Sequence, residues 1–448
     1  MSVEAQRMFY NDLFETLGKM GINYCVLHSY AGIPHRIKGD LDMCIDRSGH
    51  NVIDKVLNEI AVKRGFVIVQ KLYYDVPSCF YYVIAKLIRQ NVVTIQLDFL
   101  YDNIGINRYH LTSKEFLKTR KKYKNFFILN PLLECTYILV KKIVKRTIHR
   151  ADRIAVRNLC RDNCNEAVDL LIYFGKKRRE MVRDLIWSDD VDATELLVKL
   201  RTPISRVNLS LFLWLQKVLF EIKRMYYRVV NPTGLSIAIL SPDGGGKTTV
   251  AKELMKKLRQ CFRRTDYMHW RPCLLPEMNS LIRSRVDRTS KSNLTNHVQQ
   301  SQNYIKSSVR FLYYFLDFLI GHLKIKYLKI RTSFVVFDRY YYDYFFDPHR
   351  YNFRFQGLLY KFLLPLVPEP DLVFYLDCDP KTLFKRKKEI CMEELERQVE
   401  SARILKRVIP DCHIINNNDR SIRGVVSEIT SIILKKKAAQ TEKLLRIC

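Results

Sequence analysis

The chain has 448 residues, of which 48% are hydrophobic and 12% aromatic, so extended disorder is excluded and two ordinary domains are expected. Its formal net charge of +30 exceeds what solubility needs and indicates anionic partners: nucleotides, polyphosphates, nucleic acid or an acidic membrane surface. The twelve cysteines include no CxxC pair, which argues against a zinc ribbon or a disulfide framework and favours reduced thiols in the cytoplasm.

Two features of the hydropathy pattern concern export and membranes. The N-terminal segment mixes apolar and charged residues and lacks the continuous apolar core of a secretory signal. The longest apolar stretches, 209–220 and 311–320, fall short of the roughly 20 residues that a membrane-spanning helix needs. We therefore expect a cytoplasmic protein without a transmembrane segment.

Residues 1–130 are predicted to form an α/β domain. Apolar runs that are rich in β-branched and aromatic residues predict strands at 24–28, 41–46, 65–74 and 92–100. Helical periodicity separates these strands, so the segment should fold as a sheet covered by helices.

Three carboxylates of this domain are candidates for a metal site. Asp40 and Asp42 alternate along a predicted strand and so share one face, and Asp98 lies on a later strand. Carboxylates that converge from neighbouring strands can hold the magnesium ions of nucleotidyl transfer. The pattern resembles the minimal nucleotidyltransferase family, and the resemblance implies this fold. His28 precedes Ser29 where that family has glycine, so the site is either catalytic or vestigial.

Residues 131–230 are predicted to be a helical, basic extension. Six basic residues recur at three- and four-residue intervals, so a single helix would align them in one positive stripe. The stripe is either a binding surface for a polyanion or an acidic membrane, or a solvated helical face. These residues are Lys142, Arg146, Arg150, Arg153, Arg157 and Arg161.

A turn-rich tetrapeptide, 231–234, marks the start of the last predicted domain, 231–448. Long helical tracts separate the apolar strands that follow it, which predicts an α/β fold with a parallel sheet and helices on both faces. The predicted strands are 235–240, 333–338, 371–377 and 412–416.

The most informative segment follows the first of these strands. Its glycines let successive backbone N–H groups turn toward phosphate oxygens, and a helix begins directly afterwards. Lys247 can then reach the β- and γ-phosphates of ATP, and Thr248 can bind magnesium. Ser241 stands where the simplest phosphate-loop consensus has glycine. The residues expected to bind ATP are Asp243, Gly244, Gly245, Gly246, Lys247, Thr248 and Thr249.

A second element of the nucleotide site is expected at Asp338. It ends an apolar strand about ninety residues after the glycine-rich loop, where phosphate-loop enzymes place the carboxylate on the magnesium side of the site. The pairing of this carboxylate with the loop predicts a site for ATP and Mg²⁺.

With the motifs DRYYYD (338–343) and PDLVFYLDCDP (370–380), the C-terminal half resembles the thymidylate-kinase-like family. The resemblance implies that Asp338 and Arg339 face magnesium and the acceptor, and that Arg386 lies near a lid over the transferring phosphoryl. It also suggests an acceptor-binding role for Arg271. Arg271 and Arg386 could equally be surface charges.

The predicted reaction is in-line transfer of the γ-phosphoryl group of ATP, with no covalent intermediate. The tyrosine-rich segment 338–351 resembles a divergent branch found among proteins of cell-surface polysaccharide gene sets, so an acceptor other than thymidylate is expected. A nucleotide and a cell-surface glycan precursor are both candidates. Two alternatives stay open: an ATP-binding regulatory protein with a degenerate site, and a nucleotidyltransferase that uses the N-terminal carboxylates.

Overall fold

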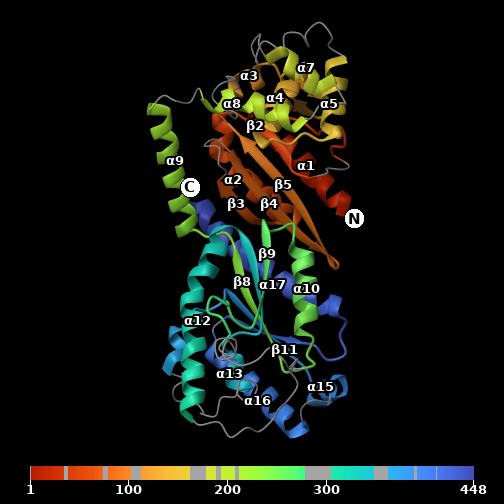
Figure 1. The fold of residues 1–448 in the computed structure, drawn as a ribbon. Coiled ribbons are helices and arrows are strands. Elements are labelled where there is room, and N and C mark those ends of the chain that lie inside the picture. Colours follow the sequence, from red (N-terminus) through yellow and green to blue (C-terminus); the bar gives the residue numbers. More distant parts are fainter. Residues whose placement is uncertain are drawn as a thin grey trace. The chain divides into compact units, whose positions relative to one another are not determined.

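The computed structural model describes residues 2–34, 39–73, 79–101, 112–161, 178–187, 193–206, 211–277, 304–347, 362–387, 391–409 and 411–447 (Figure 1). The chain divides into two compact units. The first comprises residues 1–88, 93–227 and 437–448, and the second comprises residues 89–92 and 228–436.

Within its described residues, the first unit contains a seven-stranded mixed sheet in the order β3-β4-β5-β2-β1-β7-β6. The four predicted strands are confirmed as β1, β2, β3 and β5, whereas β4, β6 and β7 were not predicted. The strands are β1 (Tyr24–Val26), β2 (Leu41–Ile45), β3 (Val67–Tyr73), β4 (Cys79–Ile88), β5 (Asn91–Leu100), β6 (Lys121–Tyr123) and β7 (Phe126–Ile128).

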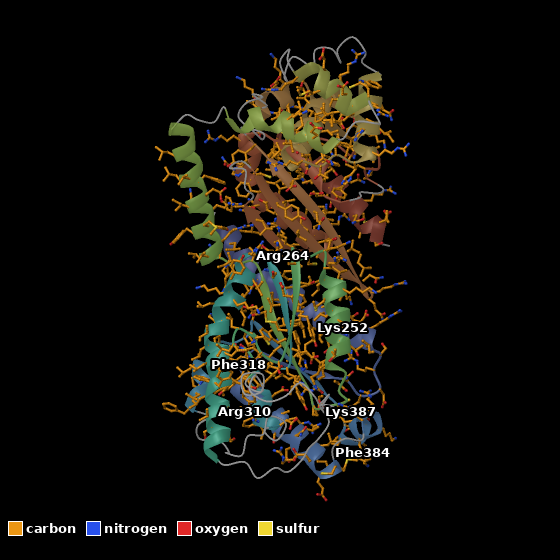
Figure 2. All side chains as sticks on the ribbon, viewed as in Figure 1. Lys252, Arg264, Arg310, Phe318, Phe384 and Lys387 are labelled. Carbon is orange, nitrogen blue, oxygen red and sulfur yellow. The ribbon has the colours of Figure 1, made fainter. Side chains whose placement is uncertain are left out.

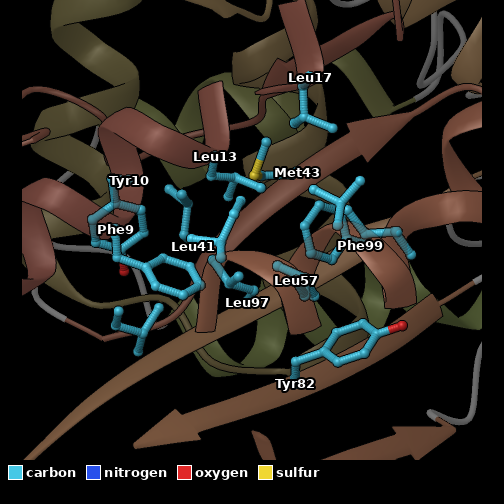
Figure 3. Close-up of a cluster of buried hydrophobic side chains, with 14 of the residues drawn as sticks. Phe9, Tyr10, Leu13, Leu17, Leu41, Met43, Leu57, Tyr82, Leu97 and Phe99 are labelled. Carbon is cyan, nitrogen blue, oxygen red and sulfur yellow. The ribbon is translucent and has the colours of Figure 1, made fainter. Parts of the chain in front are cut away.

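The two faces of this sheet carry different helices. On one face, Leu41, Met43, Leu97 and Phe99 pack with apolar side chains of α1 (Ser2–Lys19) and α2, as Figure 3 shows. The alternate residues of the strands point to the opposite face and meet helices that lie between residues 113 and 206. Among the described residues, the helices of this unit are α1, α2 (Arg47–Arg64), α3 (Ser113–Lys118), α4 (Pro131–Lys145), α5 (Arg150–Arg161), α7 (Arg179–Trp187), α8 (Ala193–Arg206), most of α9 (Leu211–Val230) and the end of α17 (Ile422–Ile447).

The predicted single basic helix from 142 to 161 is wrong. Helix α4 ends at Lys145, and Arg146 adopts a left-handed conformation with φ of 53°. The backbone N–H groups of Arg146 and Thr147 donate to the carbonyls of Ile143 and Lys142, which closes the helix end. The six basic residues therefore lie on two helices and at the turn between them.

A buried carboxyl group lies on α4. Glu134 is 4% exposed, and the hydroxyl of Tyr30 donates to it at 3.0 Å. Burial raises the pKa of Glu134 from its usual 4.5 to about 7, and the hydrogen bond from Tyr30 offsets only part of this effect. The folded chain therefore holds a proton that the unfolded chain releases above pH 4.5.

We expect Glu134→Gln to stabilise the first unit at neutral pH. Below pH 4.5 the carboxyl is protonated in both the folded and the unfolded chain, so it does not alter the free energy of unfolding. Between pH 4.5 and 7 that free energy falls, because the unfolded chain loses this proton while the folded chain keeps it. The loss is on the order of 3 kcal/mol and is complete above pH 7. Urea denaturation at pH 5 and pH 8 measures it: Glu134→Gln should flatten the pH dependence, and the exposed-site variant Glu59→Gln should not. A pH dependence that is unchanged in Glu134→Gln would exclude Glu134 as its source.

The second unit confirms the predicted α/β class, with a five-stranded parallel sheet in its described residues in the order β12-β11-β8-β10-β9. The predicted strands are confirmed as β8, β10, β11 and β12. The strands are β8 (Leu235–Leu240), β9 (Arg264–His269), β10 (Ser333–Asp338), β11 (Leu372–Asp377) and β12 (Cys412–Asn416).

Helices cover both faces of this sheet (Figure 1). Apolar residues of α12 and α16 pack with Leu240, Phe337 and Tyr375 on one face. On the other, α10 contacts β8 and β10, and Lys257 of α10 donates to Ser427 of α17 at 2.8 Å. The helices are α10 (Lys247–Leu258), α12 (Tyr304–Ile330), α13 (Asp343–Phe346), α15 (Pro380–Arg386), α16 (Met392–Val408) and α17 (Ile422–Ile447), with a 3₁₀ turn at Leu364–Leu366.

None of the helices in the described ranges combines the length and the apolar character that a bilayer crossing requires.

Candidate functional site

The glycine-rich loop joins β8 to α10 in the second unit. Gly244 and Gly246 have φ of 86° and 79°, a backbone conformation that strains residues with a Cβ atom. Helix α10 begins at Lys247, so its first N–H groups and the positive end of its dipole point toward the loop. The predicted phosphate loop therefore has the local geometry that anion binding requires.

Gly245 fits the loop for a different reason. A Cβ at this position would lie 1.8 Å from the hydroxyl oxygen of Ser241. That hydroxyl is buried and donates to the carbonyl of Leu376 on β11 at 3.0 Å. The serine that departs from the simplest consensus is thus held against the neighbouring strand, and it leaves room only for glycine at position 245.

Lys247 is buried inside the loop. Its ammonium donates to the carbonyls of Ser241 at 2.6 Å and Pro242 at 2.9 Å, and it lies 3.6 Å from the carboxylate of Asp243. Burial and the charge of Arg339 lower the pKa of Lys247 to about 8. The lysine therefore carries its charge at neutral pH, in the loop where a phosphate group would benefit from it.

Asp338 faces the start of α10 at the end of β10. Its Oδ2 accepts hydrogen bonds from the hydroxyl of Thr248 at 2.5 Å and from that of Tyr267 at 2.7 Å. Its Oδ1 is buried and has no hydrogen-bond partner among the described residues. A hydroxyl oxygen and an unpartnered carboxylate oxygen are suitable ligands for Mg²⁺, so these residues fit the ion that the phosphate loop implies.

Tyr267 on β9 was not among the predicted site residues. It reaches Asp338 because β9 pairs with β10 in parallel, with Tyr267 opposite Val336. Burial, followed by the hydrogen bond to Asp338, raises the pKa of Tyr267 to about 12, so the hydroxyl keeps its proton and remains a donor.

We expect Tyr267→Phe to lower ATP turnover in the presence of Mg²⁺ by roughly tenfold, because a hydrogen bond to a charged group contributes about 1.5–3 kcal/mol. The ring is kept and only the hydroxyl that orients Asp338 is lost. The control is Tyr327→Phe, which removes a hydroxyl from the exposed face of α12. Equal turnover in Tyr267→Phe and wild type would show that Asp338 needs no such support.

Arg339 is held by two carboxylates. Its guanidinium donates to Asp243 at 2.6 Å and to Asp343 at 3.4 Å. The ammonium of Lys387, which Figure 2 labels, lies 3.4 Å from Asp243. Arg339 has a φ of 82°, an unusual conformation for a residue with a side chain. The loop carboxylate of Asp243 therefore links the phosphate loop to two cations from distant parts of the chain.

Arg386 also lies beside the loop. It ends α15, and its Cβ is 3.7 Å from the position that a Cβ on Gly244 would occupy. Its guanidinium donates to the sulfur of Cys378 at 3.5 Å. The structure thus brings Arg386 near the predicted ATP site, and its role in catalysis stays a prediction.

Asn417 was missed by the sequence reasoning. Its amide donates to the carbonyl of Gly245 at 2.9 Å, and the side chain is 5% exposed. The available signal was its position directly after β12, because the carboxyl ends of parallel strands meet at the edge where ligands bind.

Arg271 is not a surface charge, since it is 3% exposed. Its guanidinium pairs with Asp317 at 2.8 Å and donates to the carbonyl of Leu275 at 2.7 Å. Asp317 in turn accepts the backbone N–H groups of residues 273–275. Arg271 therefore organises the loop after β9, and its predicted contact with the acceptor stays a prediction.

The three N-terminal carboxylates meet in the first unit. Strands β2 and β5 pair in parallel with Asp42 opposite Asp98, and oxygen atoms of Asp40, Asp42 and Asp98 lie within 4.8 Å of one another. No basic side chain was predicted at this site, but Lys141 of α4 forms an ion pair with Asp42. His28 lies 2.7 Å from the same carboxylate oxygen.

The carboxyl groups of this cluster differ in protonation. Burial raises the pKa of Asp42, but the hydrogen bond from His28 and the charge of Lys141 outweigh burial and hold it well below its usual value. Burial, followed by the charges of Asp42 and Asp40, raises the pKa of Asp98 to about 8. Asp42 is therefore ionised at neutral pH, and Asp98 is mostly protonated.

The second unit is thus a phosphate-loop α/β fold, and the predicted site residues Lys247, Thr248 and Asp338 lie at the carboxyl ends of its strands. Residues 242–429 match the family model described as thymidylate kinase, which confirms the predicted resemblance over that segment, less than half of the chain. Nothing in the comparisons supports the predicted resemblance of residues 1–130 to nucleotidyltransferases. No curated protein sequence matches the chain.

Two thymidylate kinases are among the similar solved structures. The enzyme from Candida albicans is 19% identical, with a TM-score of 0.36; the match covers 46% of this chain and 93% of that one. The enzyme from Ehrlichia chaffeensis is 18% identical, with a TM-score of 0.31; the match covers 45% of this chain and 98% of that one.

Proposed function

We propose that the second unit is a kinase that transfers the γ-phosphoryl group of ATP to a small acceptor. The observation that carries this proposal is the contact between Thr248, at the start of α10, and Asp338, at the end of β10. This contact joins the two elements that phosphate-loop enzymes use to bind phosphate and magnesium, across adjacent strands.

Each residue of the site has a part in this reaction. The N–H groups of residues 244–249 and the ammonium of Lys247 bind the phosphates of ATP. Thr248 and Asp338 hold Mg²⁺, which supplies charge neutralisation when it is bound. Arg339 and Arg386 face the charge that develops during transfer. All of these groups lie around one loop, which supports a single site.

The acceptor belongs to one of two candidate classes. The match to the thymidylate kinase family model makes nucleoside monophosphates the first class. The tyrosine-rich segment that follows Asp338 motivates the second, precursors of cell-surface glycans, and we propose an acceptor other than thymidylate. Arg271 and Arg339 are the residues that we propose to contact it.

An acceptor screen tests this function. The full chain is incubated with Mg-ATP and, separately, thymidylate, other nucleoside monophosphates, sugars or cell-envelope extracts, and ADP is measured. ADP formation that requires one acceptor class and is lost in Asp338→Asn supports the kinase. ATP binding without acceptor-dependent ADP would favour the regulatory alternative.

We propose metal-dependent nucleotidyl transfer in the first unit as a second candidate function. The observation that favours it is the convergence of Asp40, Asp42 and Asp98 from paired strands. Pyrophosphate release from ATP that is lost in Asp40→Ala but retained in Lys247→Ala would support it. Pyrophosphate at the background rate in the wild type would exclude it.

A further inference from the structure

The acidic cluster of the first unit contains its own cation. The ammonium of Lys141 forms the ion pair with Asp42 described above, and it lies 3.2 Å from a ring nitrogen of His28. The hydroxyl of Tyr137, one turn earlier on α4, also reaches the Asp42 carboxylate at 3.2 Å. Asp42 Oδ2 is therefore surrounded by groups from α4 and from the loop after β1.

The ionised carboxylate of Asp42 needs these neighbouring groups. It is 2% exposed, and an ionised carboxylate at that depth is costly unless a cation or several donors face it. Lys141 comes from a separate element of the fold, 99 residues away in the sequence. Its ammonium thus meets the electrostatic need that a bound metal ion would otherwise meet.

The other two acidic residues of the cluster, Asp98 and Asp40, suit a cation with a higher charge than the ammonium of Lys141. Asp98 is 9% exposed, and its Oδ1 is buried with no hydrogen-bond partner among the described residues. Asp40 is exposed and contributes a third carboxylate within 4.8 Å. Once Asp98 releases its proton, three carboxylates at this separation form a set of hard oxygen ligands for a divalent ion such as Mg²⁺ or Mn²⁺.

We propose that Asp40, Asp42 and Asp98 form a divalent-cation site in which Lys141 is the resident counter-ion, so that the metal ion and the lysine compete for Asp42. An ammonium and a divalent ion cannot share the same carboxylate oxygen at contact distance without strong repulsion. Metal binding must therefore displace Lys141 from Asp42. This inference rests on the same three carboxylates as the second candidate function and is independent of the kinase proposed for the second unit. Mn²⁺ binding tests the cation site and pyrophosphate release tests the reaction, so a failure of one is distinguishable from a failure of the other.

The test is Mn²⁺ binding to the full chain, measured by electron paramagnetic resonance of the free ion, in an Asp338→Asn background that removes the carboxylate of the phosphate-loop site. Lys141→Met should bind Mn²⁺ at least about tenfold more tightly than the parent, a difference of about 1.4 kcal/mol. Lys141→Arg, which keeps the charge, should bind like the parent. Lys145→Met, which removes an exposed ammonium one turn later on α4, should also bind like the parent.

Further variants assign the effect to this site. Adding Asp98→Asn to Lys141→Met should remove the gain in affinity. Lys141→Gln, whose amide can still donate to Asp42, serves where the methionine variant folds poorly and should also bind more tightly. Mn²⁺ should raise the Tm of either neutral variant more than that of the parent. A neutral variant that binds no more tightly than the parent, or a gain that persists with Asp98→Asn, would overturn the proposal.

Discussion

Lys247→Ala should lower phosphoryl transfer by about 100-fold or more, because the ammonium stabilises charge that develops on the transferring group. The effect should appear in kcat as well as in ATP binding. The lysine is buried in the phosphate loop and donates hydrogen bonds to the loop carbonyls of Ser241 and Pro242, so its loss should leave the sheet intact. Far-UV circular dichroism and the turnover rate of the same preparation measure the two consequences.

Two further variants make this result specific. Lys247→Met keeps most of the side-chain volume, so it separates loss of charge from loss of packing and should be nearly as inactive. Lys252→Ala removes an exposed lysine from the same helix and should turn over like the wild type (Figure 2). Turnover in Lys247→Ala equal to that in Lys252→Ala would contradict a role for Lys247 in transfer.

Gly245→Ala should strongly weaken ATP binding, because the added methyl group would lie 1.8 Å from the Ser241 hydroxyl oxygen and the loop would have to open. The expected loss of affinity is about 100-fold or more, since the backbone N–H groups of the loop act together on the phosphates. Isothermal titration calorimetry with Mg-ATP measures it.

The same geometry predicts a rescue. Ser241→Gly removes the hydroxyl oxygen that meets the methyl group and matches the simplest phosphate-loop consensus. The double variant Ser241→Gly/Gly245→Ala should therefore recover part of the affinity that Gly245→Ala loses. If the double variant binds no better than Gly245→Ala, the two residues are not coupled in the way that the structure indicates.

The second unit was predictable because its signals are local. Strands β8, β10 and β12 begin and end at the predicted residues, since each is a short apolar run with clear turns or helices on both sides. The phosphate loop depends on consecutive residues, so its glycines, Lys247 and Thr248 were visible in one segment.

The contacts that were missed are made over long distances in the sequence. Tyr267 reaches Asp338, and Asn417 reaches Gly245, only because the strand order places their ends together. Lys141 meets Asp42 for the same reason, since α4 packs on the face of the sheet to which Asp42 points. Residue spacing carries no information about such pairings.

The single basic helix was mispredicted for a local reason. Basic residues at three- and four-residue intervals suit a continuous helix, and Arg146 is an ordinary helix former. The chain nevertheless ends the helix at Arg146 in a left-handed conformation, where glycine is the usual residue. Without that glycine, the sequence gives no sign of the turn.

The most direct test of the proposed kinase compares [γ-³²P]ATP with [α-³²P]ATP in parallel incubations of the full chain with Mg²⁺ and the acceptor found in the screen. If the second unit is a kinase, the γ-label should enter the acceptor, the α-label should stay in ADP, and transfer should be lost in Lys247→Ala. An α-label that enters the acceptor with release of pyrophosphate would contradict the proposed kinase and would move the chemistry to the N-terminal carboxylates.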